Sequence, residues 1–205
     1  MKIMVVLAHP STKSFNHAIT ETVVQALNEN GHEVMFHDLY QENFDPVLPY
    51  NEILKGSQLD PQIKQHTDEL SNADGIIIVH PSWWGQPPAI LKGWIDRVFR
   101  TGVAYEFRDG EAGVATPVGL LKAENSLVIN TENTPQDIIE REFGDTLEDI
   151  WNKSVLTFCG IKNFHRKVYD QVIISTPEQR QFWLNDVRAM VNQLFPQASG
   201  MRISA

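Results

Sequence analysis

Three uninterrupted apolar runs constrain the fold of this 205-residue chain more than any other feature. Lys2–Ala8, Gly75–His80 and Ser126–Asn130 are built around Ile, Val and Leu without regular alternation of polar residues. Such a run predicts a strand that is buried on both faces, as in a parallel sheet. Glu33–Asp38 and Val168–Ile174 are also predicted as strands, so we expect five strands in all.

Helices are predicted between these strands, because apolar residues recur there at helical spacing. The predicted helices are Asn16–Asn30, Asp60–Ser71, Pro88–Phe99, Asp137–Phe158 and Pro177–Phe195. A right-handed crossover between neighbouring parallel strands needs such a helix. The order of elements therefore predicts a doubly wound α/β fold, a five-stranded parallel sheet with helices on both faces.

The composition narrows the domain organisation and the classes of partner. The chain has 17 Lys and Arg against 26 Asp and Glu, a formal net charge of −9, and no long basic run. Nucleic-acid and anionic-membrane surfaces need clustered cations, so we expect neither partner. Because no repeat or interdomain linker is found, we expect a single domain over residues 1–205, with long loops over Asn43–Gly56 and Arg108–Pro117.

The single cysteine bears on the compartment. Cys159 is the only cysteine and lies in an apolar setting, which predicts an inert buried thiol in a reducing compartment. We find no secretion signal and no apolar stretch approaching the roughly 20 residues of a membrane span. A cytoplasmic location is therefore expected.

Three polar loops follow the predicted strands, at the edge where ligands of open parallel sheets bind. These loops are His9–Asn16, His80–Pro87 and Asn130–Thr134. In the first loop, Ser14 and Asn16 precede a helix whose free N–H groups and dipole favour a phosphate, although simple capping of the helix explains them equally well. The loop lacks glycine, so it is neither a dinucleotide-binding fingerprint nor a P-loop.

Trp83 and Trp84 stand between prolines in the second loop. For a tryptophan pair, burial in the core is the commoner explanation. A rigid aromatic wall for a planar cofactor is the alternative, since ring stacking contributes roughly 0.5–1.5 kcal/mol beyond buried area.

Other ionisable side chains favour structural explanations. His9 and His80 both end strands, but the surrounding sequence supplies no further ligands at suitable spacing, so no metal site is predicted. Asp96, Arg97 and Arg100 lie on an amphipathic helix and are expected to be solvated surface charges.

Several segments taken together match a known family. His9–Ala18, Pro81–Phe99 and Gly102–Tyr105 resemble the NAD(P)H:quinone oxidoreductases of the flavodoxin-like fold, and the likeness extends more loosely to about Phe195. The resemblance implies strand order 2-1-3-4-5, a tightly bound flavin that is either FMN or FAD, and NAD(P)H as co-substrate. It also implies a homodimer with active sites at the subunit interface.

The resemblance implies roles for individual residues. Those matching the loop that binds the flavin phosphate are His9, Ser14, Phe15, Asn16 and Ala18. Those matching the loop that lines the isoalloxazine are Pro81, Ser82, Trp83 and Trp84. We expect the backbone N–H groups of residues 83–85, ending at Gly85, to face the N1 and O2 side of the ring. Asn130, Thr131 and Asn133 are expected to donate to the ring edge, and Tyr105 and Phe107 to enter the partner subunit's substrate pocket.

The third loop departs from the best-known members of that family. Their Thr-Thr-Gly-Gly run is replaced by Asn-Thr-Glu-Asn at residues 130–133, and the Tyr and His that relay charge in relatives have no clear counterpart. No catalytic residue is therefore predicted.

The expected activity is ping-pong, two-electron reduction of quinones or similar small acceptors by NAD(P)H. Two alternatives remain open: a flavodoxin-type electron carrier, and a regulatory flavoprotein subunit of a membrane-bound potassium-efflux system.

Overall fold

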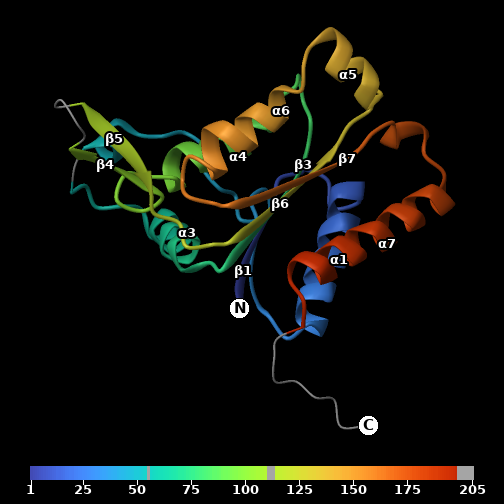
Figure 1. Cartoon of the computed structure of the whole chain (residues 1–205), viewed down its shortest axis with the longest axis horizontal. Coiled ribbons are helices and arrows are strands. Elements are labelled where there is room, and N and C mark those ends of the chain that lie inside the picture. Colours follow the sequence, from blue (N-terminus) through green and yellow to red (C-terminus); the bar gives the residue numbers. More distant parts are fainter. Residues whose placement is uncertain (55, 110–113, 198–205) are drawn as a thin grey trace.

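A five-stranded parallel sheet of order β2-β1-β3-β6-β7 forms the centre of the protein (Figure 1). The structure, a computed structural model, describes residues 1–54, 56–109 and 114–197. The strands are β1 (Lys2–Leu7), β2 (Glu33–Asp38), β3 (Gly75–Pro81), β6 (Asn125–Thr131) and β7 (Asn163–Tyr169). Numbered within the sheet, this order is 2-1-3-4-5, so the predicted topology is confirmed.

Helices cover both faces of the sheet, because the residues of the central strands alternate between two cores. Ile3, Val5 and Leu7 of β1 pack toward α1 (Phe15–Glu29) and α7 (Pro177–Leu194), which lie side by side in Figure 1. The intervening residues of β1 pack toward α3 (Pro61–Asn72), α4 (Ala89–Val98) and a π-helix (Asp149–Leu156). The uninterrupted apolar run therefore reflects burial on both faces.

The fifth strand lies earlier in the chain than predicted. The strand is Asn163–Tyr169, whereas Val172–Ile174 form a 3-10 turn in which Ile173 and Ile174 are exposed. The prediction of Val168–Ile174 was wrong because β7 is an edge strand, only half-buried, and so tolerates the basic residues that interrupt its pattern.

Three other segments differ from expectation. The helix predicted over Asp137–Phe158 is divided into α5 (Gln136–Glu142), α6 (Thr146–Glu148) and the π-helix, and Gly144, with φ +73°, separates the first two. Much of the loop predicted over Arg108–Pro117 is an antiparallel hairpin of β4 (Tyr105–Asp109) and β5 (Ala115–Gly119), and the loop predicted over Asn43–Gly56 contains α2 (Tyr50–Ile53). The two predicted loops and the predicted domain include residues outside the described ranges, namely 55, 110–113 and 198–205.

Arg97 is not a surface charge, contrary to the prediction. Its side chain is 6% exposed, and Nη2 and Nε donate to the Glu52 carboxylate at 2.6 and 3.1 Å. Arg100 is also partly buried and donates to the carbonyl of Glu52. Asp96, by contrast, is exposed and pairs with Lys92 at 2.6 Å, as expected for a solvated charge.

Gly93 allows the loop that carries Glu52 to lie against α4. A Cβ at position 93 would lie 2.2 Å from the carbonyl oxygen of Pro46. The apolar spacing of α4 could not reveal the ion pair between Arg97 and Glu52, because the two residues are 45 positions apart in the sequence.

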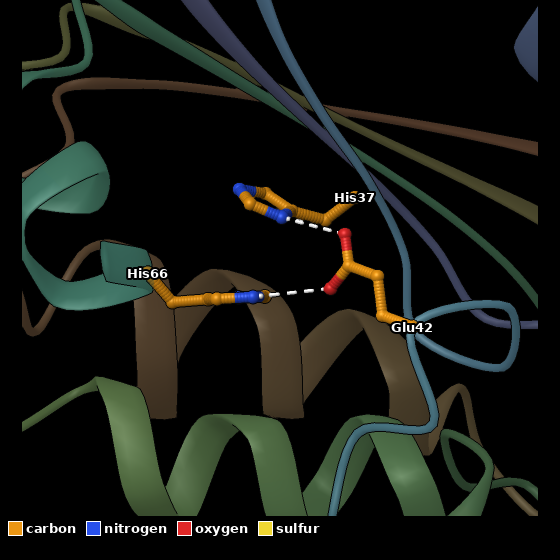
Figure 2. A group of neighbouring side chains, drawn as sticks. All are labelled: His37, Glu42 and His66. Carbon is orange, nitrogen blue, oxygen red and sulfur yellow. Dashed lines mark hydrogen bonds and ion pairs between the residues drawn. The ribbon is translucent and has the colours of Figure 1, made fainter. Parts of the chain in front are cut away.

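A cluster of ionisable side chains joins β2, the following loop and α3 (Figure 2). His37 lies between two carboxylates, with Nδ1 2.9 Å from Glu42 and Nε2 2.5 Å from Glu69. His66 Nε2 lies 3.1 Å from the second oxygen of Glu42, and the two imidazole rings stack at 3.9 Å.

The nitrogen and oxygen atoms of His37, Glu42 and His66 are close enough to hold a metal ion. However, Trp94 Nε1–H donates to His66 Nδ1 at 2.9 Å, so the proton of a neutral His66 is on Nε2, facing Glu42. A metal at this cluster would need the lone pair of that same nitrogen. The arrangement therefore favours a hydrogen-bonded structural cluster.

Two further observations concern the whole fold. Within the described ranges, no helix is long and apolar enough to cross a membrane. Cys159 is 2% exposed, and burial raises the pKa of its thiol to about 12, as expected for an inert thiol.

We expect Glu52→Gln to lower the free energy of unfolding by about 3 kcal/mol, because it leaves the Arg97 guanidinium buried without its counter-charge. Asp96→Asn, which breaks an exposed pair on the same helix, should cost less than about 1 kcal/mol. Urea unfolding of both variants measures the difference, and equal losses would contradict the structural role of the buried pair.

The stability contributed by His37 should depend on pH. Burial lowers the pKa of His37, but hydrogen bonds and charges from Glu42 and Glu69 outweigh burial and raise it above 6.5. The stabilisation is therefore complete below pH 6.5 and is lost as the pH rises through the folded-state pKa.

His37→Gln should accordingly show a smaller fall in unfolding free energy above pH 6.5 than the unmodified protein. Urea unfolding across this range tests the difference. His165→Gln, at a half-buried histidine on β7, is the matched control. A pH dependence that is unchanged in His37→Gln would show that the cluster does not titrate as described.

Candidate functional site

The loops after β1, β3 and β6 meet at one edge of the sheet, as predicted, and enclose a cavity of about 180 Å³ that we call the loop cavity. All three loops contribute to its wall. The lining residues are His9, Ser14, Phe15, Asn16, Pro81, Ser82, Trp83, Thr131, Glu132, Asn133 and Val172. Of the predicted cofactor-binding residues, only Ala18, Trp84, Gly85 and Asn130 are not among them.

A second cavity of about 460 Å³, which we call the outer cavity, adjoins the loop cavity. The two cavities share Ser82, Glu132 and Asn133. Trp84 and Gly85 line the outer cavity, together with Phe143 beyond α5. Most of the residues predicted to contact the flavin therefore lie around two adjoining cavities.

Ser14 is the N-cap of α1, because its Oγ accepts a hydrogen bond from the N–H of His17 at 3.2 Å. Capping thus accounts for this serine, and phosphate binding stays a prediction. The first turn of a helix also has N–H groups without intrahelical acceptors. Ala18 lies one turn into α1, where its N–H donates to the carbonyl of Ser14.

His9 and Asn16 present polar atoms at the loop cavity. His9 Nδ1 lies 3.0 Å from the backbone nitrogen of Ser11 and 3.2 Å from its carbonyl oxygen, and burial lowers the pKa of the ring. Asn16 is 3% exposed and donates through Nδ2 to Thr131 Oγ1 at 2.9 Å. Its buried Oδ1 has no hydrogen-bond partner in the part of the chain that the structure describes.

The tryptophan loop is a two-residue hairpin. Trp83 and Gln86 exchange backbone hydrogen bonds of 3.0 and 3.1 Å, and both Trp84 and Gly85 adopt left-handed φ, as in a type I′ turn. Trp83 is 41% exposed and Trp84 fully exposed, so burial in the core, the commoner explanation, is wrong here. A non-glycine residue at positive φ costs about 1 kcal/mol or more, and such strain is concentrated at functional sites.

Asn130 belongs to a buried network beneath the loops, not to the cavity wall. Its Nδ2 lies 2.8 Å from His80 Nε2, which also accepts from Trp151 Nε1 at 2.9 Å. Asn130 Oδ1 accepts from Arg166 Nε at 2.7 Å. Burial lowers the pKa of His80 to about 4, and its Nδ1–H donates to the carbonyl of Pro81. His80 is therefore a neutral structural residue.

Tyr105 and Phe107 lie on the β4–β5 hairpin, away from the loop cavity of the same chain. With Phe158 they line a separate cavity of about 330 Å³. The rings of Phe107 and Phe158 each pack against Tyr105, at centroid distances of 5.8 and 5.2 Å. The chain on its own does not bring these aromatics to the predicted flavin site.

Glu132 is a site residue that was not predicted. It is 6% exposed and lines both cavities. The only sign of it in the sequence was the replacement of a small-residue loop by Asn-Thr-Glu-Asn at residues 130–133.

Comparison with known proteins bears on the family. The family described as having a flavodoxin-like fold matches residues 1–192. A Haemophilus influenzae protein named as an uncharacterized NAD(P)H oxidoreductase is 34% identical, covering 88% of this chain and 89% of that protein. NAD(P)H dehydrogenase (quinone) 1 of Rattus norvegicus is 28% identical, covering 87% and 72% of the two chains.

A solved structure agrees with this relationship. NAD(P)H:quinone oxidoreductase from Methanothermobacter marburgensis superposes with a TM-score of 0.80 at 27% identity, covering 95% of this chain and 96% of that one. Together with the strand order and the edge site, these matches show that the chain belongs to the flavodoxin-like family that includes NAD(P)H:quinone oxidoreductases.

Proposed function

We propose that this protein is a flavin-dependent NAD(P)H oxidoreductase that reduces quinones or similar small acceptors by two-electron transfer. The loop cavity is the observation that carries the proposal. It joins the start of α1, an exposed tryptophan and an unpaired buried amide oxygen at the carboxyl edge of a doubly wound sheet. The names of the relatives support the same activity.

The start of α1 suits the phosphate of a flavin. Free N–H groups in its first turn and the positive end of the helix dipole favour an anion. The imidazole of His9 adds a polar group at the same wall. Because both FMN and FAD have a phosphate attached to the ribityl chain, this geometry suits either cofactor.

The second and third loops suit the isoalloxazine ring. Pro81, Ser82 and Trp83 form one side of the loop cavity, and Thr131 and Asn133 come from the neighbouring strand end. Asn16 Oδ1 is a buried acceptor that a donor of the ligand would satisfy, which fits a cofactor with hydroxyl and imide N–H groups. When bound, the flavin supplies the hydride chemistry, while these residues position the ring and exclude water.

We expect the chain to form a single flavin-binding domain over residues 1–205 and to act in the cytoplasm. A homodimer of this domain would complete the substrate pocket. Phe107 is 57% exposed, and Tyr105 and Phe158 lie beside it. An aromatic cluster with an exposed phenylalanine is suited to reach the site of a second subunit. This arrangement explains why these aromatics lie away from the loop cavity of their own chain.

The purified protein, reconstituted with FMN or FAD, should show a flavin absorption band that NADH or NADPH bleaches and a quinone restores. Initial rates at varied NAD(P)H and quinone should give parallel double-reciprocal lines, because one site serves both substrates in turn. Intersecting lines would contradict alternating occupation of that site. A protein that binds neither flavin would contradict the proposed function as a whole.

Asn16→Ala should weaken flavin binding about tenfold, because one hydrogen bond to a buried group is worth about 1 kcal/mol or somewhat more. Fluorescence titration of the apoprotein with FMN and FAD measures the change. Asn28→Ala, at an exposed position on the same helix, is the matched control and should bind like the unmodified protein. Equal affinity in all three proteins would place the flavin elsewhere.

A further inference from the structure

Glu132 places a buried carboxyl group between the loop cavity and the outer cavity. Its N–H donates to the carbonyl of Tyr169 at 2.9 Å, which fixes the residue just beyond β6. Within the described residues, its Oε2 is fully buried and has no hydrogen-bond partner. Burying an unpaired carboxylate is costly, so a proton or a ligand group must satisfy this oxygen.

The surroundings of Glu132 raise the pKa of its carboxyl above the ordinary value of a glutamate. Burial raises the pKa of this carboxyl above 4.5, and the charges of Asp145 and Asp170 raise it further. A hydrogen bond with Ser82 and the charge of Arg166 act in the opposite direction but do not reverse the shift.

The direct ion pairs of Arg166 are with other carboxylates, although its Nη2 is buried without a hydrogen-bond partner among the described residues. Its Nη1 donates to Asp145 and lies 3.6 Å from Glu148, while Nε donates to Asn130. Within the described residues, Arg166 thus forms ion pairs with Asp145 and Glu148 but none with Glu132.

We propose that Glu132 holds the proton that this site delivers to its quinone-class substrate, an inference that rests on the proposed oxidoreductase function. Its place in the wall shared by the two cavities puts the carboxyl beside both the predicted flavin position and the outer cavity. Trp84 and Phe143 give the outer cavity an apolar wall for a planar acceptor.

The proton balance of the reaction creates the need for such a group. Reduction of a quinone to a hydroquinone takes two electrons and two protons, and the hydride of NAD(P)H supplies both electrons and one proton. The O–H bond of Glu132 breaks with its electron pair left on the carboxylate, and a new O–H bond forms at the quinone oxygen. The carboxylate then regains its proton from a hydronium ion of the solvent, so the reaction consumes one solvent proton for each quinone reduced.

The protonation state is testable without flavin or activity. Carbon-13 NMR of protein labelled at glutamate side chains should show one carboxyl that titrates above pH 4.5 and is absent from Glu132→Gln. Glu142→Gln, at an exposed position, is the matched control and should retain that resonance. A Glu132 resonance that shows an ionised carboxylate at the pH of the quinone assay would overturn the proposal.

Kinetics separate proton delivery from a structural role. Glu132→Gln keeps the shape of the side chain but lacks the acidic proton, and its rates are compared with those of the unmodified protein per bound flavin. Its kcat/KM for a quinone should fall roughly 100-fold, as for loss of a general acid. Ferricyanide accepts electrons without protons, so its reduction should fall much less than that of the quinone.

The outcomes are distinct. Unimpaired quinone reduction in Glu132→Gln, or an equal loss with quinone and ferricyanide, would overturn the role of Glu132 and leave the oxidoreductase function standing. An unmodified protein that oxidises NAD(P)H with neither acceptor would overturn both proposals.

Discussion

Burial of β1, β3 and β6 on both faces is the constraint on which the rest of the structure depends. Strands enclosed between two helical layers have no place for unpaired polar side chains. Polar residues are therefore confined to the strand ends, and the parallel arrangement brings the carboxyl ends to one edge. His80 and Asn130 mark this boundary, since they are buried polar residues near the carboxyl ends of β3 and β6 and hydrogen-bond to each other.

A hydrogen-bonded network of buried side chains lies beneath the loops at this boundary. Neutral His80 accepts from both Asn130 and Trp151, and Arg166 links Asn130 to the charges around α6. A buried network of this kind helps to fix the loops that rest on it. Within the described residues, Asn16 Oδ1 and Glu132 Oε2 are buried without a hydrogen-bond partner, and both belong to residues that line the loop cavity.

The sequence predicted those parts of the fold in which burial imposes a period: the central strands and the helices α1, α3, α4 and α7. It failed where the partner of a residue lies far away in the chain, as with Arg97 and Glu52, or where an edge strand is only half-buried, as with β7. The site residues came mainly from family resemblance. Neither pattern nor resemblance could show that Trp84 is fully exposed or that Glu132 lines both cavities.

The central claim is that the loop cavity holds the flavin, and a crystal structure of the flavin-loaded protein tests it most directly. The account predicts the phosphate at the first turn of α1 and the ring against Trp83, with Asn16 Oδ1 accepting a hydrogen bond from the ligand. A larger cavity of about 480 Å³ between α1 and β2, lined by Val24 and Phe36, is the competing location. Flavin density in that cavity, with the loop cavity holding only water, would contradict the account.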